Sequence, residues 1–161
     1  MKIISSLIVA TALLTTTVSA KEGDIYAGIQ ASYPAYGASV KYDFSDKIAV
    51  QGVLGAFGTI GSFNVRGIYR FMQKQDYWNI YGFGSVGVLT WGGTRYHSSE
   101  TSFSVGGGAG VEWDWKKFLQ EKFRFKFVPL YSSLEVGFSS GSFDYYDYNA
   151  GYVGAGIHYR F

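Results

Sequence analysis

Charged side chains recur at alternate positions of several short apolar segments in this sequence. Alternate residues of an extended strand lie on the same face, so these groups would gather on one face of a sheet. Carboxylates and cations that share a confined space must be paired or hydrated. The sequence therefore predicts a network of ion pairs, with Glu112 and Glu135 within salt-bridge reach of Lys41 or Arg66. The predicted network comprises Lys41, Arg66, Arg70, Glu112, Glu135, His158 and Arg160.

Hydrolysis is the other chemistry that the residue types suggest. His97-Ser98-Ser99-Glu100 contains the side chains of a catalytic triad. Neighbouring residues of one exposed loop rarely hold triad geometry, so we interpret this segment as a solvated loop. His158 has no evident metal-binding partner, and a chain without cysteine has neither disulfides nor thiolate metal sites. We expect no catalytic, cofactor or metal site.

The elements that must position the charged groups are strands. In the segment 151–161, odd positions from Val153 to Phe161 are apolar or aromatic and even positions are small or polar. Strict alternation of this kind indicates a strand with one apolar and one polar face. Seven further segments show a related pattern, which makes eight strands in all. The expected strands are 24–31, 38–44, 48–56, 63–71, 77–91, 103–113, 123–138 and 151–161.

Two of these segments leave questions open. The fifth strand could present either the face of Tyr81 and Phe83 or the opposite face to the outside. The seventh changes parity, and a bulge at Val128-Pro129 would absorb the shift, since proline is tolerated at bulges. Residues 116–122, which precede it, are charged and do not alternate, so they form either a long turn or a short helix.

Composition supports a single all-β domain. The chain has 161 residues, 22 of them glycine and 19% aromatic, a composition that suits short alternating strands. A net charge of +2, without a basic cluster that could form a groove, indicates no nucleic-acid partner. Residues 1–20 have a positive start at Lys2, an apolar run and a Val18-Ser19-Ala20 cleavage pattern. We interpret them as a cleaved secretory signal peptide.

The remaining residues, 21–161, contain no apolar stretch long enough for a membrane-spanning helix. If this chain spans a membrane, it must do so as a closed barrel, because an open sheet edge in lipid leaves backbone groups unpaired. Eight is an even number of strands, as in bacterial barrels. The predicted fold is an all-β, eight-stranded antiparallel up-and-down transmembrane β-barrel.

The last strand resembles the C-terminal assembly signal of bacterial outer-membrane barrels, in which alternating apolar residues precede a final Phe. Here the matching residues are Ile157, Tyr159 and Phe161. Residues 21–161 as a whole resemble the small eight-stranded barrels of the OmpA/OmpX-like class. This resemblance implies an exported protein in the outer membrane of a Gram-negative cell, in contact with lipid and lipopolysaccharide. It also implies insertion by the barrel-assembly machinery, short periplasmic turns and longer extracellular loops.

The resemblance is specific to architecture and not to activity. We expect a structural or surface-contact role without catalysis, because no set of polar residues converges at the lipid face or outer rim. A Tyr/Asp-rich loop is the candidate for adhesion to an unidentified extracellular ligand, since Tyr supplies contact area at low entropy cost. Its contact residues are Phe143, Tyr145, Tyr146 and Tyr148. One alternative is a narrow or gated, porin-like ion pore. A lipid A-modifying barrel enzyme is less favoured, because Leu130-Tyr131-Ser132 stands where such enzymes carry His-x-Ser.

Overall fold

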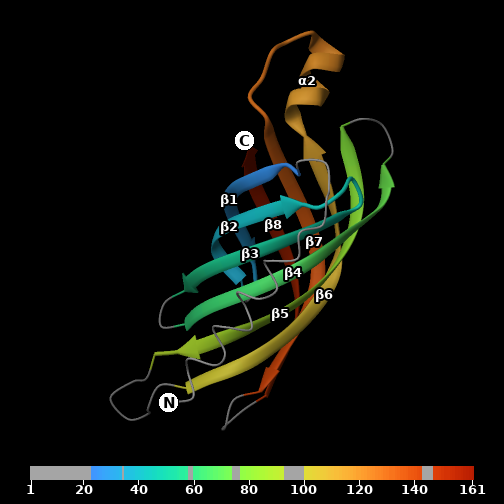
Figure 1. Ribbon diagram of the computed structural model, residues 1–161. Coiled ribbons are helices and arrows are strands. Elements are labelled where there is room, and N and C mark those ends of the chain that lie inside the picture. The colour runs from blue at the N-terminus through green and yellow to red at the C-terminus, as the bar shows by residue number, and fades with distance from the viewer. Residues whose placement is uncertain (1–22, 34, 58–59, 74–76, 93–99, 143–146) are drawn as a thin grey trace.

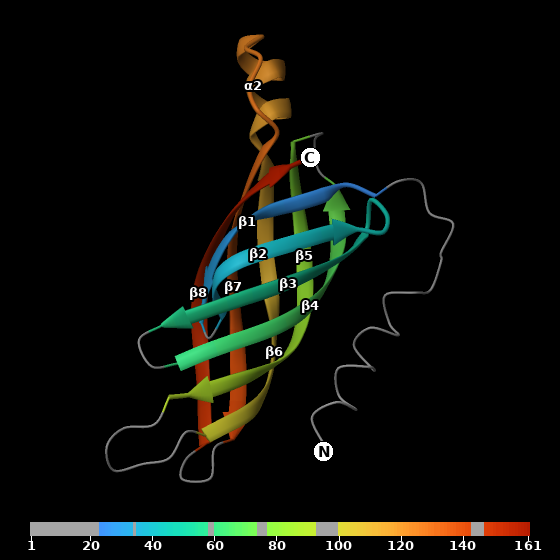
Figure 2. The ribbon, with the colours of Figure 1, turned by 60° about the vertical axis from the view of Figure 1, so that its left-hand side comes forward.

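The protein forms a closed antiparallel barrel in which each strand pairs with its neighbours in the chain and β1 pairs with β8. The computed structural model describes residues 23–33, 35–57, 60–73, 77–92, 100–142 and 147–161, so the predicted signal peptide lies outside the described residues. Figures 1 and 2 show the strands tilted around the barrel, with α2 and the C-terminus at the same end. We call this the α2 end. The predicted eight-stranded up-and-down barrel is confirmed.

The strands run from 8 to 15 residues. Their bounds are β1 Ile25–Ser32, β2 Ala35–Asp43, β3 Ile48–Phe57, β4 Ile60–Gln73, β5 Trp78–Trp91, β6 Glu100–Asp114, β7 Leu130–Ser142 and β8 Asp147–Arg160. The helix α2, Trp115–Phe123, lies between β6 and β7. Among the described residues, no helix combines the length and the hydropathy that a membrane crossing requires.

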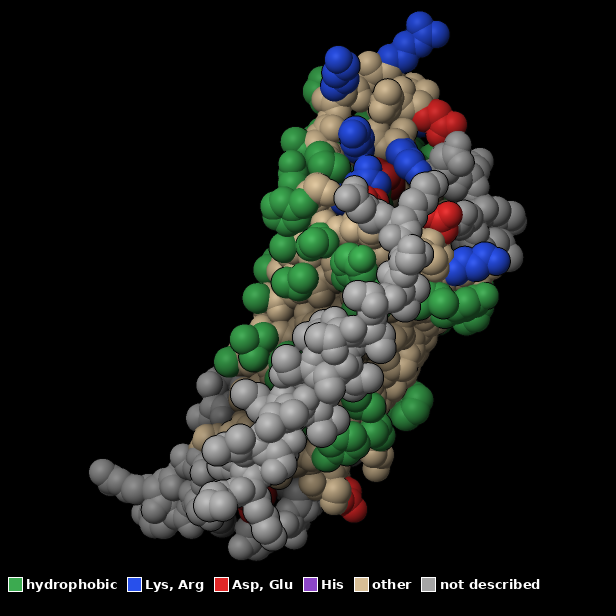
Figure 3. Space-filling model, in the orientation of Figure 1, with side chains coloured by type: hydrophobic (Ala, Val, Ile, Leu, Met, Phe, Trp, Pro, Cys, Tyr) green, Lys and Arg blue, Asp and Glu red, His purple; other side chains and the backbone are tan. Residues whose placement is uncertain are grey.

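The alternation seen in the sequence separates an apolar outside from a polar inside. Val153, Phe71 and Leu54 are among the large hydrophobic side chains on the outer surface, and Val153 is 77% exposed. The inward positions hold buried serines, glutamines and charged residues, such as Ser39, Gln51 and Lys41. Hydrophobic side chains also spread over the barrel wall in Figure 3. The fold is therefore inverted relative to a water-soluble domain, which buries its apolar side chains.

The structure settles the face of the fifth strand. Tyr81 and Phe83 point inward and are 5% and 7% exposed. They lie opposite Gly110 and Gly108 of β6. A Cβ atom at Gly110 would lie 2.5 Å from the Tyr81 ring, and one at Gly108 would lie 2.9 Å from the Phe83 ring. The two glycines of β6, which have no side chain, thus make room for two aromatic rings inside a narrow barrel.

The predicted bulge at Val128-Pro129 was wrong. The strand β7 begins only at Leu130, and the preceding residues form α2 and a connection without regular structure. Asp114 stops the β6 pattern because its carboxylate accepts a hydrogen bond from the Lys117 backbone N–H at 3.0 Å and so caps α2. The helix ends at Phe123, and the next residue, Arg124, caps it in the left-handed conformation with φ 53°. The register shift that does occur lies in β4, between Arg70 and Met72.

Candidate functional site: an ion-pair network inside the barrel

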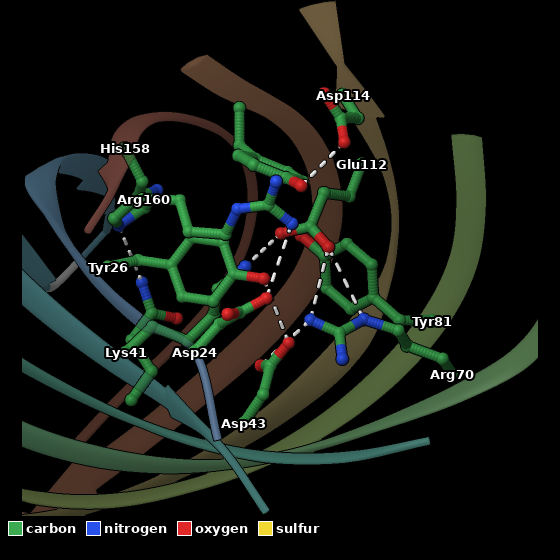
Figure 4. Close-up of polar contacts among 12 residues, drawn as sticks. Asp24, Tyr26, Lys41, Asp43, Arg70, Tyr81, Glu112, Asp114, His158 and Arg160 are labelled. Carbon is green, nitrogen blue, oxygen red and sulfur yellow. Dashed lines mark hydrogen bonds and ion pairs between the residues drawn. The ribbon is translucent and has the colours of Figure 1, made fainter. Parts of the chain in front are cut away.

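The network begins at the α2 end with one carboxylate between two cations. Glu112 of β6 accepts hydrogen bonds from Lys41 of β2 and from Arg70 of β4. The Arg70 Nη2 atom lies 3.2 Å from Glu112 Oε2 and 3.0 Å from Asp43 Oδ1. Tyr26 donates to the other Asp43 oxygen at 3.0 Å. These contacts link four strands across the lumen (Figure 4).

A second ion pair lies deeper in the barrel. Arg66 Nη2 is 2.6 Å from Glu135 Oε1, and both side chains are buried. The Tyr81 hydroxyl donates to Glu135 Oε2 at 3.1 Å, and the Arg66 guanidinium lies 4.0 Å from the Phe83 ring centroid. The two inward aromatic residues of β5 thus contact both members of this ion pair. Both carboxylates predicted from the sequence therefore meet the cations expected for them.

His158 and Arg160 have different surroundings, although both lie on the inward parity of β8. His158 is buried, and its Nε2 atom is 2.9 Å from Ser39 Oγ and 3.3 Å from Gln51 Nε2. Arg160 instead pairs with Asp24 at 3.2 Å, with 24% of its side chain exposed. Arg160 thus lies at the rim end of the network, where its guanidinium is also 5.4 Å from the Tyr131 ring centroid. Within the described residues, no cluster of three or more His, Cys, Asp or Glu could hold a metal ion.

Three tyrosines support the network and were not identified from the sequence. Tyr131 donates a hydrogen bond of 2.6 Å to Asp114, and its ring packs edge-on against Tyr26 at 5.0 Å. The Lys41 ammonium lies 4.2 Å from the Tyr26 ring centroid, which adds a cation–π contact. With Tyr81, these residues share the inward parity of the charged groups on their strands. That parity is the sequence signal that could have identified them.

Polar space borders the network on both sides. A hollow of about 110 Å³ at the α2 end is lined by Asp24, Asp43, Arg70 and Arg160, among others. A smaller recess, about 10 Å³, lies beyond Arg66 and is lined by Ser32, Asn64, Ser85, Ser139 and Tyr152. Among the described residues, the Asn64 Nδ2 atom is buried without a hydrogen-bond partner. The ion pairs therefore lie between a wider polar mouth and a serine-rich interior.

The segments considered for catalysis and for surface contact lie mostly outside the described residues. Ser132 points to the outer surface, where its Oγ atom accepts a hydrogen bond from Trp115 Nε1 at 2.8 Å. The segment 97–99 lies outside the described residues, and Glu100 is the first residue of β6. In the Tyr/Asp-rich loop, Phe143, Tyr145 and Tyr146 also lie outside them, while Tyr148 belongs to β8 opposite Gly141.

Comparison with known proteins supports the fold. No family model matches the sequence, and no curated protein matches it either. The N-terminal β-barrel domain of Pseudomonas aeruginosa OprF is similar in structure, with a TM-score of 0.57 and 13% identity over 86% of this chain and 96% of that one. Ail, the attachment invasion locus protein of Yersinia pestis, has a TM-score of 0.47 and 18% identity over 88% and 99%.

At this identity, similarity to the OprF domain establishes the fold alone. The chain has the fold of a small eight-stranded outer-membrane β-barrel, as its sequence resemblance predicted.

Proposed function

We propose that the protein is an integral outer-membrane barrel with a structural or surface-contact role, and that it is not an enzyme. The observation that carries this proposal is the inverted distribution of side chains. Large apolar residues cover the outer surface, and the charged residues of β2, β4, β6 and β7 lie inside. An apolar band outside and a polar interior are what a bilayer requires of a barrel. The partners are membrane lipid and lipopolysaccharide around the wall, reached after export through the signal peptide.

Aromatic pairs at the α2 end indicate that this end lies at a membrane interface. Tyr42 packs against Phe44, Tyr69 against Phe71 and Tyr159 against Phe161, with ring centroids 4.9, 5.3 and 5.1 Å apart. All three pairs have at least one ring on the outer surface. Rings of this kind prefer the boundary between hydrocarbon and headgroups. In the outer-membrane barrels that this chain resembles, the last strand ends at the periplasmic rim, and here β8 ends beside α2. We therefore assign the α2 end to the periplasm and the opposite end to the cell exterior.

Cysteine labelling tests this orientation, and a chain without cysteine allows single substitutions. Ser142→Cys lies at the end of β7, and Asp46→Cys lies in the turn between β2 and β3, where both native residues are exposed. On intact cells, an impermeant maleimide should modify Ser142→Cys and leave Asp46→Cys unmodified until the membrane is permeabilised. Labelling of Asp46→Cys alone would invert the orientation. Recovery of both variants in the soluble fraction would contradict membrane insertion.

A narrow or gated ion pore is the second candidate. The observation in its favour is the polar space on both sides of the ion pairs. An eight-stranded barrel leaves little room beyond its own side chains, and here buried charged and aromatic groups fill the middle of the lumen. A plugged lumen therefore accounts better for the geometry than an open path.

We also propose that the barrel-assembly machinery recognises β8 through Ile157, Tyr159 and Phe161. These side chains lie on the outer surface, and Phe161 is 75% exposed. The Phe161 backbone N–H donates to Ile25 O at 3.0 Å, so deletion of Phe161 removes one hydrogen bond, worth about 1 kcal/mol. We expect the deletion to reduce outer-membrane insertion strongly in cells while refolding in detergent changes little, both read from heat-modifiable gel mobility.

Phe71→Ala is the matched control, because Phe71 is a similarly exposed ring at the same end of the barrel. This variant should insert normally. If the protein without Phe161 reaches the outer membrane in the same amount as the full-length protein, the machinery does not recognise β8 through this residue.

A further inference from the structure

Residues 115–129, which we call the α2 hairpin, stand off the end of the barrel (Figures 1 and 2). The helix in it has no buried residue. The hairpin contacts the barrel near its base, where Trp115 donates to Ser132 and Phe118 packs against Tyr77 at 5.2 Å. A helix of nine residues gains little stability by itself. The barrel's own packing therefore does not account for its exposed surface.

The aromatic side of the hairpin is continuous with the outer surface of the barrel wall. Trp115 is bonded to Ser132, which alternates with the buried Tyr131 and Ser133 and so faces outward. From Trp115, ring contacts lead to Phe118 at 5.9 Å and on to Phe123 at 6.3 Å. Phe123 is 69% exposed. The proposed lipid-facing surface therefore extends beyond the barrel along one side of α2.

The hairpin is also rich in cations. Lys117 lines the polar hollow at the barrel mouth, together with Asp114 and Arg160. Lys and Arg side chains gather at this end of the molecule in Figure 3. The hairpin has five cations and one carboxylate, namely Lys116, Lys117, Lys122, Arg124, Lys126 and Glu121. None of these cations forms an ion pair with a carboxylate that the structure describes.

We propose that the α2 hairpin binds the anionic phospholipid headgroups of the membrane leaflet at the α2 end. This proposal rests on the membrane insertion proposed above. Aromatic rings favour the interface, and basic residues near an anionic surface are attracted to its phosphates. Trp115, Phe118 and Phe123 would enter the interface as an extension of the barrel wall, and Lys122, Arg124 and Lys126 would contact phosphate. The hairpin thereby fixes the depth of the barrel and selects anionic lipid around it.

A fluorescent reporter on the hairpin tests the proposal. Leu119→Cys, on the aromatic side of α2, is labelled with the polarity-sensitive dye NBD in nanodiscs that hold one barrel each. Discs of phosphatidylcholine are compared with discs in which one third of the lipid is phosphatidylglycerol. We expect about twofold stronger, blue-shifted emission in the anionic discs, reversed by molar salt, which screens surface charge. The same dye on Asp46→Cys, in the β2–β3 turn at the same end, should respond little.

Two variants separate the contributions of the rings and of the charges. Phe123→Ser/Phe125→Ser should leave the NBD emission weak in both kinds of disc, because the hairpin no longer enters the interface. Lys122→Gln/Lys126→Gln should make the emission equal in the two kinds of disc. Equal emission in the two lipids would overturn the proposal. If the NBD emission rises only in discs that hold two barrels, the proposal is also overturned, because the hairpin then contacts a second copy of the protein. Heat-modifiable mobility, measured on each sample, shows separately whether the barrel itself is inserted.

Discussion

Replacing Glu112 by Ala should lower the free energy of unfolding by about 3–5 kcal/mol, because removal of one partner leaves buried charges uncompensated. Glu112 is 6% exposed and accepts hydrogen bonds from both Lys41 and Arg70. Arg70 retains Asp43 at 3.0 Å. Among the described residues, Lys41 keeps only its contacts with the Tyr26 and Tyr131 rings, whose centroids lie 4.2 and 5.7 Å from its ammonium. The measurement is urea unfolding of the protein in lipid vesicles, followed by tryptophan fluorescence.

Two control variants test whether the loss of stability in Glu112→Ala comes from an unpaired buried charge. Glu112→Ala/Lys41→Met removes the stranded cation with its partner and should recover much of the loss, since a buried ion pair can be exchanged for apolar residues at little cost. Asp24→Ala breaks the partly exposed pair with Arg160 and should cost only about 0–1 kcal/mol. If Glu112→Ala is as stable as Asp24→Ala, water already fills the lumen. Increased conductance of that variant in planar bilayers would then favour the gated pore.

Parity along the strands determined how much of the site could be predicted. Lys41, Arg66 and Glu112 lie inside because each strand alternates strictly, and a closed barrel brings them together across the lumen. Parity gives the face of a residue and not its depth. Arg160 has the inward parity of His158, but it is the last residue of β8 and reaches the rim, where it meets Asp24. The depth depends on the stagger between strands, which no single segment reveals.

The features that the sequence left open depend on neighbouring elements. The face of Tyr81 could not be decided within its own strand, where glycine and larger residues alternate, but Gly110 across the strand pair leaves room for its ring. The apparent change of parity before β7 predicts, from the sequence alone, a strand with a bulge. It arises because Asp114 caps a helix, after which the alternating phenylalanines 123, 125 and 127 fall outside any strand. A capping carboxylate at the end of an alternating segment is the signal that distinguishes the two readings.

The central claim is that the apolar outer surface of the barrel lies in lipid, and Val136→Arg tests it most directly. Val136 is at the middle of β7, points outward and pairs with Ala109 and Val153. Arginine at the bilayer midplane of a barrel costs about 2–4 kcal/mol, and the cost falls to about 0–1 kcal/mol near the interfaces. Ser142→Arg, at the exposed end of the same strand, is therefore the matched control.

The measurement is the free energy of unfolding of the two variants and the native protein in the same phospholipid vesicles. We predict a loss of about 2–4 kcal/mol for Val136→Arg and of at most about 1 kcal/mol for Ser142→Arg. An exposed position in water tolerates such a change within about 0.5 kcal/mol. Equal stability of Val136→Arg, Ser142→Arg and the native protein would show that the middle of β7 does not face lipid, and would contradict the account of this barrel as a membrane protein.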